Sequence, residues 1–347
     1  MKKFFIILSV LILLSSCSSE PLTPTEKLKK MSTEEKVAQM LMVRCDKANM
    51  DNILSYQPGG ILMFGVDFND LPKDEVIQTI KQYKSACDVE PIIAVDEEGG
   101  TVVRVSSNPD LAPEKYQSPQ FYYNEGGIDE ISRIETEKSK LLKSLGITMN
   151  LAPVADISQN PDDFIYDRSL GQDEVITSEF ISAAVTAMKP NKVFSCLKHF
   201  PGYGNNVDTH TGIAIDNRAL QALREKDFLP FKAGIEAGAD AVLVSHNIIT
   251  DIDSSLPASV SAPVHNILRN ELSFNGIILT DDMSMQAMAE YNKPYAKAVL
   301  AGNDMIIVSD FYAAYNEILT EVKSGLIPTE KLDEAVMRIL DKKQELK

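Results

Sequence analysis

The segment KHFPGYGNNVDTHTG, residues 198–212, holds the side chains of this chain that are best suited to acid–base chemistry. It contains two of only four histidines, His199 and His210. Asp208 stands two residues before His210, so its carboxylate can accept the second ring N–H, orient the imidazole and stabilise the charged form. Free histidine titrates near ~6.5 and therefore exchanges protons near neutrality. The surrounding glycines and asparagines indicate a loop, where a histidine without such a neighbour is commonly a solvated surface residue.

Polar residues also stand directly after short apolar runs that are typical of buried strands. These residues are Asp96, Lys198, His246, Asp281 and Asp310. In a parallel α/β barrel the carboxyl ends of the strands form the face that carries the active site. A polar residue at a strand end has other uses as well. Asp281 could equally cap a helix that starts near residue 284, and His246 could equally be a hydrogen-bonded core histidine.

The order of the predicted elements favours a TIM-type (β/α)8 barrel of one domain. Apolar runs without polar alternation, which indicate buried parallel strands, alternate with amphipathic helical stretches. We count seven such strands, at residues 61–64, 91–95, 147–151, 193–197, 241–244, 276–279 and 304–308. A closed barrel needs eight. We expect the irregular or missing strand in the weakly patterned residues 101–126.

The N-terminus predicts export. Two lysines precede an apolar run of eleven residues, which is too short to span a bilayer but suits a secretory signal peptide. The following Leu-Ser-Ser-Cys resembles the lipobox of bacterial lipoproteins, which implies acylation of Cys17; an ordinary signal peptide with an incidental cysteine is the alternative. We therefore expect a signal peptide at 1–16, a lipid-anchored tether at 17–32 and a catalytic barrel at 33–347.

The net charge and the cysteine content of the chain limit the kinds of binding partner that we expect. The formal net charge of −16 becomes −18 when Lys2 and Lys3 are removed, and such an acidic chain is not suited to nucleic acid. The remaining cysteines, Cys45, Cys87 and Cys196, form no metal-binding or disulfide framework, so we expect buried thiols, although one disulfide is compatible with their number. We expect a monomer that needs no cofactor and no metal.

Several motifs together resemble glycoside hydrolase family 3, in particular its single-domain β-N-acetylglucosaminidases. They occur in the family's order over nearly all of the chain beyond residue 55. The motifs are VDEEGG at 95–100 with Arg104, APVAD at 152–156, DRS at 167–169, KHFPG at 198–202, DTH at 208–210 and LTDDMSM at 279–285.

The resemblance implies a role for each matching residue. Asp281 would be the nucleophile, His210 the acid/base and Asp208 the residue that orients His210. The residues implied to bind substrate are Asp96, Arg104, Arg168, Lys198 and His199, with His246 placed near the site by its strand position. Arg104 could instead brace Asp96 or Asp281 as an ion pair.

The implied activity is release of nonreducing GlcNAc by double displacement through a covalent glycosyl-aspartate, with peptidoglycan fragments as the expected substrate. The protein would be exported and lipid-anchored to a bacterial membrane. The sequence departs from the family at Tyr203, where a histidine is common, and in the segment after His210, which lacks a common proline.

Three alternatives stay open at this stage. His199, Asp208 and His210 could cluster around zinc, although no HExxH or cysteine set accompanies them. A GlcNAc glycoside phosphorylase would use the same residues with phosphate as acceptor. A surface lipoprotein could also bind glycans without cleaving them.

Overall fold

The computed structural model describes residues 22–206, 212 and 214–346. Eight parallel strands form one sheet in the order β10-β1-β2-β3-β4-β5-β7-β9. An isolated β-bridge between Leu279 and Met305 joins the two outer strands, so the sheet is a barrel with one seam. The TIM-type fold is confirmed. The strands are β1 (Leu41–Arg44), β2 (Gly60–Met63), β3 (Ile92–Val95), β4 (Met149–Asn150), β5 (Phe194–Phe200), β7 (Ala241–Val244), β9 (Ile277–Thr280) and β10 (Ile306–Val308).

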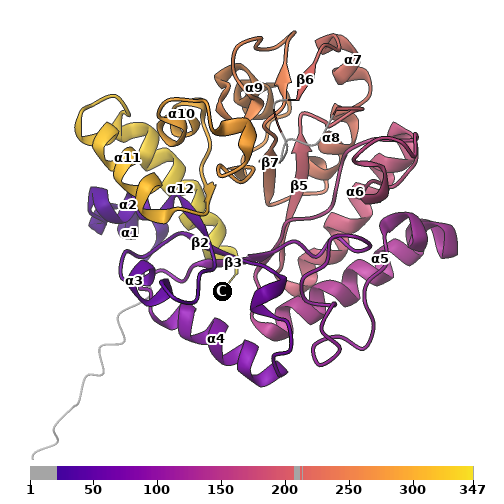
Figure 1. The fold of residues 1–347 in the computed structure, drawn as a ribbon, viewed down its shortest axis with the longest axis horizontal. Coiled ribbons are helices and arrows are strands. Elements are labelled where there is room, and N and C mark those ends of the chain that lie inside the picture. Colours follow the sequence, from indigo (N-terminus) through magenta and orange to yellow (C-terminus); the bar gives the residue numbers. More distant parts are fainter. Residues whose placement is uncertain (1–21, 207–211, 213, 347) are drawn as a thin grey trace, which may run out of the picture.

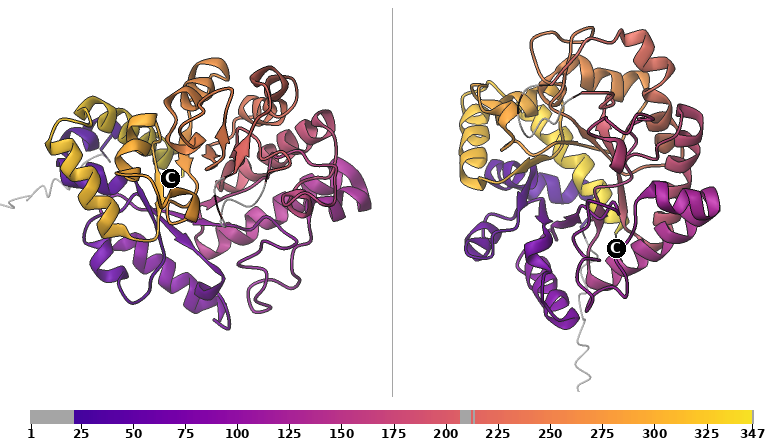
Figure 2. Two further views of the ribbon diagram at one scale, coloured as in Figure 1. Left: turned by 45° about the horizontal axis from the view of Figure 1, so that its top comes forward. Right: turned by 45° about the vertical axis from the view of Figure 1, so that its right-hand side comes forward.

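Helices surround the strands in the order of the chain (Figure 1), and the turned views show the same ring (Figure 2). The last helix packs against the first two, which closes the ring. The helices are α1 (Pro24–Lys30), α2 (Thr33–Gln39), α3 (Met50–Leu54), α4 (Lys73–Ser85), α5 (Pro119–Leu145, kinked at its two glycines), α6 (Glu174–Met188), α7 (Leu220–Glu225), α8 (Phe228–Glu236), α9 (Ala262–Asn266), α10 (Pro294–Ala301), α11 (Phe311–Lys323) and α12 (Thr329–Glu345).

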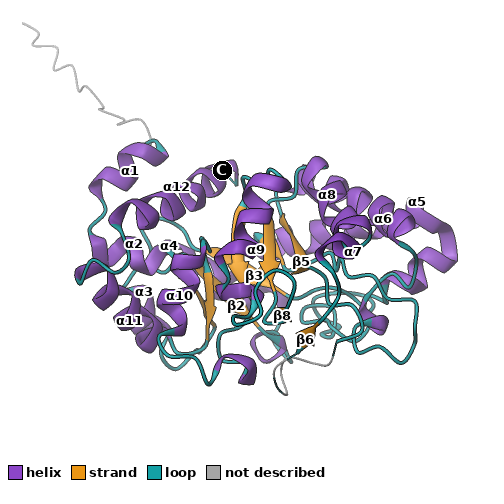
Figure 3. Cartoon of the chain, turned by 90° about the horizontal axis from the view of Figure 1, so that it is seen from above, coloured by secondary structure: helices purple, strands orange, loops and turns teal. Residues whose placement is uncertain are grey.

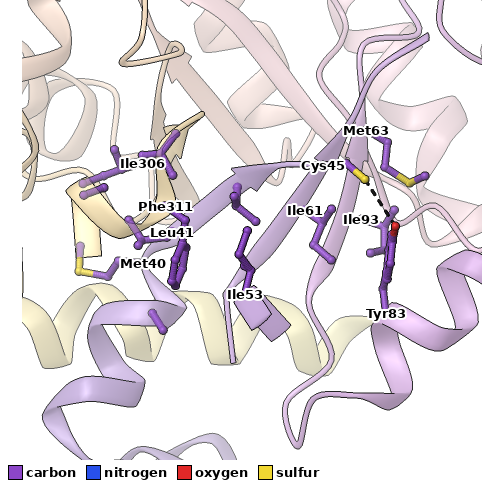
Figure 4. Packing of buried hydrophobic residues seen from close by; sticks show 14 of the residues in the cluster. Met40, Leu41, Cys45, Ile53, Ile61, Met63, Tyr83, Ile93, Ile306 and Phe311 are labelled. Carbon is purple, nitrogen blue, oxygen red and sulfur yellow. Dashed lines mark hydrogen bonds between the residues drawn. The ribbon is translucent and has the colours of Figure 1, made fainter. Parts of the chain in front are cut away.

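The core explains why the strand sequences do not alternate. Side chains such as Met42, Leu62 and Met149 fill the barrel interior, while Leu41, Ile61 and their neighbours pack outward against the helices (Figure 4). Both faces of each strand are therefore buried, as in other parallel sheets. Apart from Arg44, every residue of the eight described barrel strands is at most slightly exposed.

The position of the eighth strand was wrong in the prediction from sequence. Residues 101–126 contribute only an isolated bridge between Gly99 and Val102 and the start of α5. The eighth strand is β1, which pairs with both β10 and β2. Only Met40 separates α2 from β1. The buried end of the helix and the strand therefore form one continuous buried run, polar only at Gln39, with no turn residues to mark the boundary.

Helix α1 lies at the amino-terminal end of the barrel, opposite the loops that follow the strands (Figure 3). It covers residues that the sequence analysis assigned to the tether, and it packs against α12. Leu346, just after α12, packs against the cluster that fills the barrel interior. Both ends of the described chain therefore lie away from the carboxyl ends of the strands.

Two expectations about single residues can be compared with the structure. Cys45, Cys87 and Cys196 are buried free thiols; the Cys45 sulfur lies 3.6 Å from the Tyr83 hydroxyl (Figure 4). The sequence also places His265 on a helix that we expect at the surface; in the structure His265 belongs to α9 and is buried, facing Gly302 after α10. Within the described part of the chain, no helix is both long and apolar enough to cross a bilayer.

Candidate active site

A small cavity of about 180 Å³ opens among the segments that follow the barrel strands. Most of the residues that the sequence singled out line it together: Asp96, Arg104, Arg168, Lys198, His199 and Asp281. Asp96 follows β3, Lys198 and His199 belong to β5, and Asp281 follows β9. The parallel strands end on one face, so they deliver side chains from distant parts of the sequence to one place.

A buried lysine links two carboxylates on one wall of the cavity. Lys198 Nζ lies 2.8 Å from Asp96 Oδ1 and also contacts Glu98 Oε1. Burial opposes the charged form of Lys198, but Asp96 and Glu98 outweigh it and raise the pKa of the ammonium. Lys198 is therefore a fixed cation that can hold a sugar hydroxyl.

Glu98 was quoted in a motif but given no role by the sequence analysis. Its side chain is 2% exposed and accepts two hydrogen bonds from Arg168, at 2.9 Å from Nε and 2.8 Å from Nη2. Although burial works in the opposite direction, Lys198 and Arg168 hold the pKa of Glu98 well below its usual range. Glu98 is thus the carboxylate that positions both cations. The only sequence signal was its place as the third acidic residue in the run from Asp96 to Glu98.

His199 is held by partners on both ring nitrogens. Nδ1 lies 2.7 Å from Asp156 Oδ2, and Nε2 lies 3.1 Å from Arg168 Nη2. A guanidinium can only donate, so Nε2 accepts and the proton sits on Nδ1, facing Asp156. Asp156 also accepts the backbone N–H groups of His199 and Tyr203. The aspartate that ends the APVAD motif therefore fixes the start of the KHFPG loop.

Arg104 approaches Asp96 rather than Asp281. Its Nη2 lies 3.8 Å from Asp96 Oδ2, while its buried Nε has no hydrogen-bond partner in the described structure. Buried Glu97 accepts the backbone N–H groups of Arg104 and Val105, each at 2.7 Å. Glu97 therefore shapes the loop that carries Arg104 to the cavity.

Asp281 and Asp282 have different surroundings. The Asp281 N–H donates to Val244 O on β7, and its Oδ1 accepts the N–H of Asp282. The Asp282 carboxylate accepts the Ser284 N–H at 2.9 Å and the Ser309 hydroxyl at 3.3 Å. Asp282 thus orders the turn after β9, and Asp281 projects from that turn into the cavity lining.

His246 does not line the cavity. It is fully buried, with Nδ1 2.7 Å from Ser259 Oγ and Nε2 3.0 Å from the backbone oxygen of Asp282. A carbonyl oxygen can only accept, so Nε2 carries a proton. His246 therefore supports the segment next to Asp281 from beneath, and its expected place among the sugar-binding residues is not confirmed.

Asp208, His210 and Cys17 lie outside the described residues. The described chain leads to the loop through Tyr203 and leaves it through β6 (Ile215–Asp216), which pairs with β8 (Ile248–Ile249). Three aromatic residues that the sequence analysis did not assign to the site line the cavity: Phe64, Phe164 and Tyr203. An aromatic residue in a loop carries no sequence signal that separates a sugar contact from core packing.

Comparisons of the sequence with protein families and with known proteins agree on one family. A sequence model of the glycosyl hydrolase family 3 N-terminal domain matches residues 32–341. The β-hexosaminidase of Hydrogenovibrio crunogenus is 31% identical over 280 residues, which is 78% of this chain and 77% of that protein.

Solved structures with a similar fold include members of the same family. The fold matches a family 3 β-N-acetylglucosaminidase from Paenibacillus sp. with a TM-score of 0.85 at 28% identity; the match covers 91% of this chain but 63% of that longer one. It matches LpqI of M tuberculosis with a TM-score of 0.85 at 26% identity, covering 93% of this chain and 96% of that one.

Proposed function

Because the chain belongs to glycoside hydrolase family 3, we propose that this enzyme is an exo-acting, retaining β-N-acetylglucosaminidase that removes nonreducing GlcNAc. The observation that carries the proposal is one small cavity that joins Asp281 to the Asp96–Lys198–Glu98–Arg168 cluster. A closed cluster of fixed charges suits the hydroxyls of one terminal sugar. The activities named for the relatives, β-hexosaminidase and β-N-acetylglucosaminidase, support GlcNAc as that sugar.

In the proposed first step, a carboxylate oxygen of Asp281 attacks the anomeric carbon. The bond from that carbon to the leaving oxygen breaks, and the leaving oxygen takes a proton from His210. In the second step a water gives a proton back to His210, attacks the same carbon and displaces Asp281. Two inversions give overall retention. Asp208 orients His210 and stabilises its charged form.

The remaining cavity residues hold the sugar. We assign the hydroxyl contacts to Asp96, Lys198 and Arg168, whose polar atoms are fixed before substrate arrives by the Asp96–Lys198 pair and by Glu98, which contacts Lys198 and Arg168. Such preorganisation lowers the cost of ordering side chains on binding. The His199 Nε2 is occupied by Arg168, so His199 shapes the wall and holds Arg168 in place.

We further propose that the substrate is a peptidoglycan fragment and that the protein acts from a lipid anchor on Cys17 at a bacterial membrane. Support for the anchor comes from the sequence of residues 1–17. The substrate assignment rests on the resemblance to the single-domain branch of the family.

A trapping experiment tests the reaction. Incubation with a 5-fluoro GlcNAc donor that has a good leaving group should add one sugar mass to the protein, on the peptide that contains Asp281. Label on another residue would identify that residue, and not Asp281, as the nucleophile. The absence of both label and turnover, with measurable GlcNAc binding, would favour a glycan-binding protein. Release of GlcNAc-1-phosphate in phosphate buffer would instead identify a phosphorylase.

A further inference from the structure

Arg44 stands out among the arginines of this chain. Every other arginine has a carboxylate oxygen within 4.0 Å. Within the described residues the Arg44 guanidinium has neither an ion pair nor a hydrogen bond; its one described contact is with the ring of Phe64, at 4.2 Å from the centroid. An unpaired arginine is unexpected in a chain with 50 acidic residues.

The position of Arg44 is equally unusual. It is the last residue of β1 and the one exposed residue on the eight described barrel strands. It pairs in register with Leu62 of β2, two residues before Phe64. Leu62 and Phe64 both line the cavity. Arg44 therefore stands at the active-site end of the barrel, beside the cavity wall.

Phe64 connects Arg44 to the site already described. Asp67 accepts the backbone N–H of Phe64 at 2.8 Å and fixes the turn that carries the ring. The Arg104 guanidinium also lies over this ring, 5.7 Å from its centroid. Its Nε is the buried donor that has no hydrogen-bond partner in the described structure. Two guanidinium groups thus share one ring, and only Arg104 has a carboxylate nearby.

Two cations that contact one aromatic ring repel each other, and an anion near both reduces that repulsion. Planar guanidinium groups favour carboxylates, which they bind through two parallel hydrogen bonds. The GlcNAc unit of the proposed substrate is neutral, so a substrate carboxylate that reaches these arginines belongs to the leaving part.

We propose that Arg44, supported by Phe64, is a specificity residue that binds a carboxylate on the leaving part of the substrate. This inference rests on the proposed function, and it assigns the recognition of an aglycone carboxylate to Arg44.

Two disaccharides test it. Both carry β-1,4-linked GlcNAc; in one the reducing sugar bears a carboxylate, and in the other the same group is a neutral amide. We expect wild-type kcat/KM to be roughly tenfold or more higher for the acid, the range of one charge-assisted hydrogen-bonded contact. Arg44→Ala should bring the acid-to-amide ratio close to one. Arg44→Lys should give an intermediate ratio, because it keeps the charge and loses the planar fork.

The matched control is Arg133→Ala, which removes an exposed arginine on α5 that is paired with Glu130 and Glu137; it should keep the wild-type ratio. The preference should also weaken as salt rises from low to high concentration. A wild-type ratio near one, or equal losses on acid and amide in Arg44→Ala, would overturn the inference while leaving GlcNAc release intact.

Binding separates this inference from the proposed reaction. Calorimetry with Asp281→Asn should show tighter binding of the acid than of the amide, and Arg44→Ala in that background should remove the difference. This result would support the carboxylate site even if the wild type turned over neither disaccharide. Equal affinities for acid and amide would refute it even if hydrolysis were fast.

Discussion

Lys198 Nζ and Asp96 Oδ1 lie 2.8 Å apart although 102 positions separate them in the chain. Both stand at carboxyl ends of barrel strands, and Glu98 and Arg168 complete the cluster. Each cation there contacts a carboxylate, which is why burial does not neutralise them. The same arrangement leaves Asp281 on another part of the cavity lining, where it can meet a sugar held by the cluster.

Replacing Asp281 with alanine should abolish turnover without unfolding the protein. The proposed reaction loses its nucleophile, so kcat on an aryl GlcNAc glycoside should fall on the order of 10⁴-fold or more. Asp310→Ala is the control, because Asp310 also follows a barrel strand but caps α11 and does not line the cavity. Retention of a tenth of the rate in Asp281→Ala would place the nucleophile elsewhere.

Replacing His210 with alanine should separate substrates by their leaving groups. A disaccharide needs a proton on its leaving oxygen, so its kcat/KM should fall by roughly 100-fold or more. An activated aryl glycoside needs little help and should lose far less in the glycosylation step. Pre-steady-state rates on the two substrates provide the measurement. Equal losses would remove His210 from the acid role.

Glu98→Gln should weaken both stability and substrate binding. It keeps the shape but leaves Lys198 and Arg168 without their shared carboxylate, which should cost about 3–5 kcal/mol in the free energy of unfolding. Asp304→Asn is the matched control: Asp304 is fully buried and pairs with Arg269 and Arg338, away from the cavity. Both variants should unfold at lower urea concentration, but only Glu98→Gln should raise KM.

The effect of Glu98→Gln should also depend on pH. The pKa of Glu98 is lowered in the folded protein from its usual 4.5. The contribution of the Glu98 carboxylate to the free energy of unfolding is therefore complete above about pH 4.5. It is lost as the pH falls from there toward the pKa of Glu98 in the folded protein. The difference in unfolding free energy between wild type and Glu98→Gln should shrink below about pH 4.5. A constant difference down to pH 3 would contradict this ion-pair assignment.

Lys343→Met should change how stability depends on alkaline pH. Burial lowers the pKa of Lys343 from 10.5 to about 7, and its Nζ donates to Gln39 Oε1 at 2.8 Å. Between those two pH values the unfolded chain binds the extra proton, so wild-type stability should rise with pH by at most about 1.4 kcal/mol per unit. Urea unfolding from pH 7 to 10 should show this rise in wild type and not in Lys343→Met.

The adjacent Lys342 provides the control. Burial opposes its charge, but Asp240, 3.1 Å away, raises its pKa. Lys342→Met should therefore lower the free energy of unfolding at neutral pH. Between about pH 7 and 9 that free energy should still rise with pH as it does in the wild type. If Lys343→Met followed the wild-type curve, the buried lysine would not be the titrating group.

Cys17→Ser should release the protein from membranes. Without the thiol no acyl chain can be attached, and a lipid anchor contributes its affinity through buried methylene groups. Fractionation of cells that express the two forms should move the variant from the membrane pellet to the soluble exported fraction. An unchanged membrane fraction would exclude Cys17 as the lipidation site.

The barrel was predictable because its strands keep one pattern: short apolar runs that end in a polar residue. Asp96, Lys198 and Asp281 were predictable as neighbours for the same reason, since parallel strands place those ends together, whereas Arg104 and Arg168 were named only by the family resemblance. β1 was missed because α2 runs into it without turn residues. Glu98 and Asp156 were in motifs, but their roles depend on contacts with Arg168 and His199 across the barrel, which local sequence does not encode. His246 has a strand-end position like that of Asp281. It is nevertheless buried, and its ring contacts the backbone oxygen of Asp282 in the turn after β9.

The amino-terminal placement of α1 has a practical consequence. Helix α1 and the C-terminal end both lie at the end of the barrel away from the loops that follow the strands (Figure 3), so a fusion partner or a solid support joined after α12 leaves the entrance to the cavity clear.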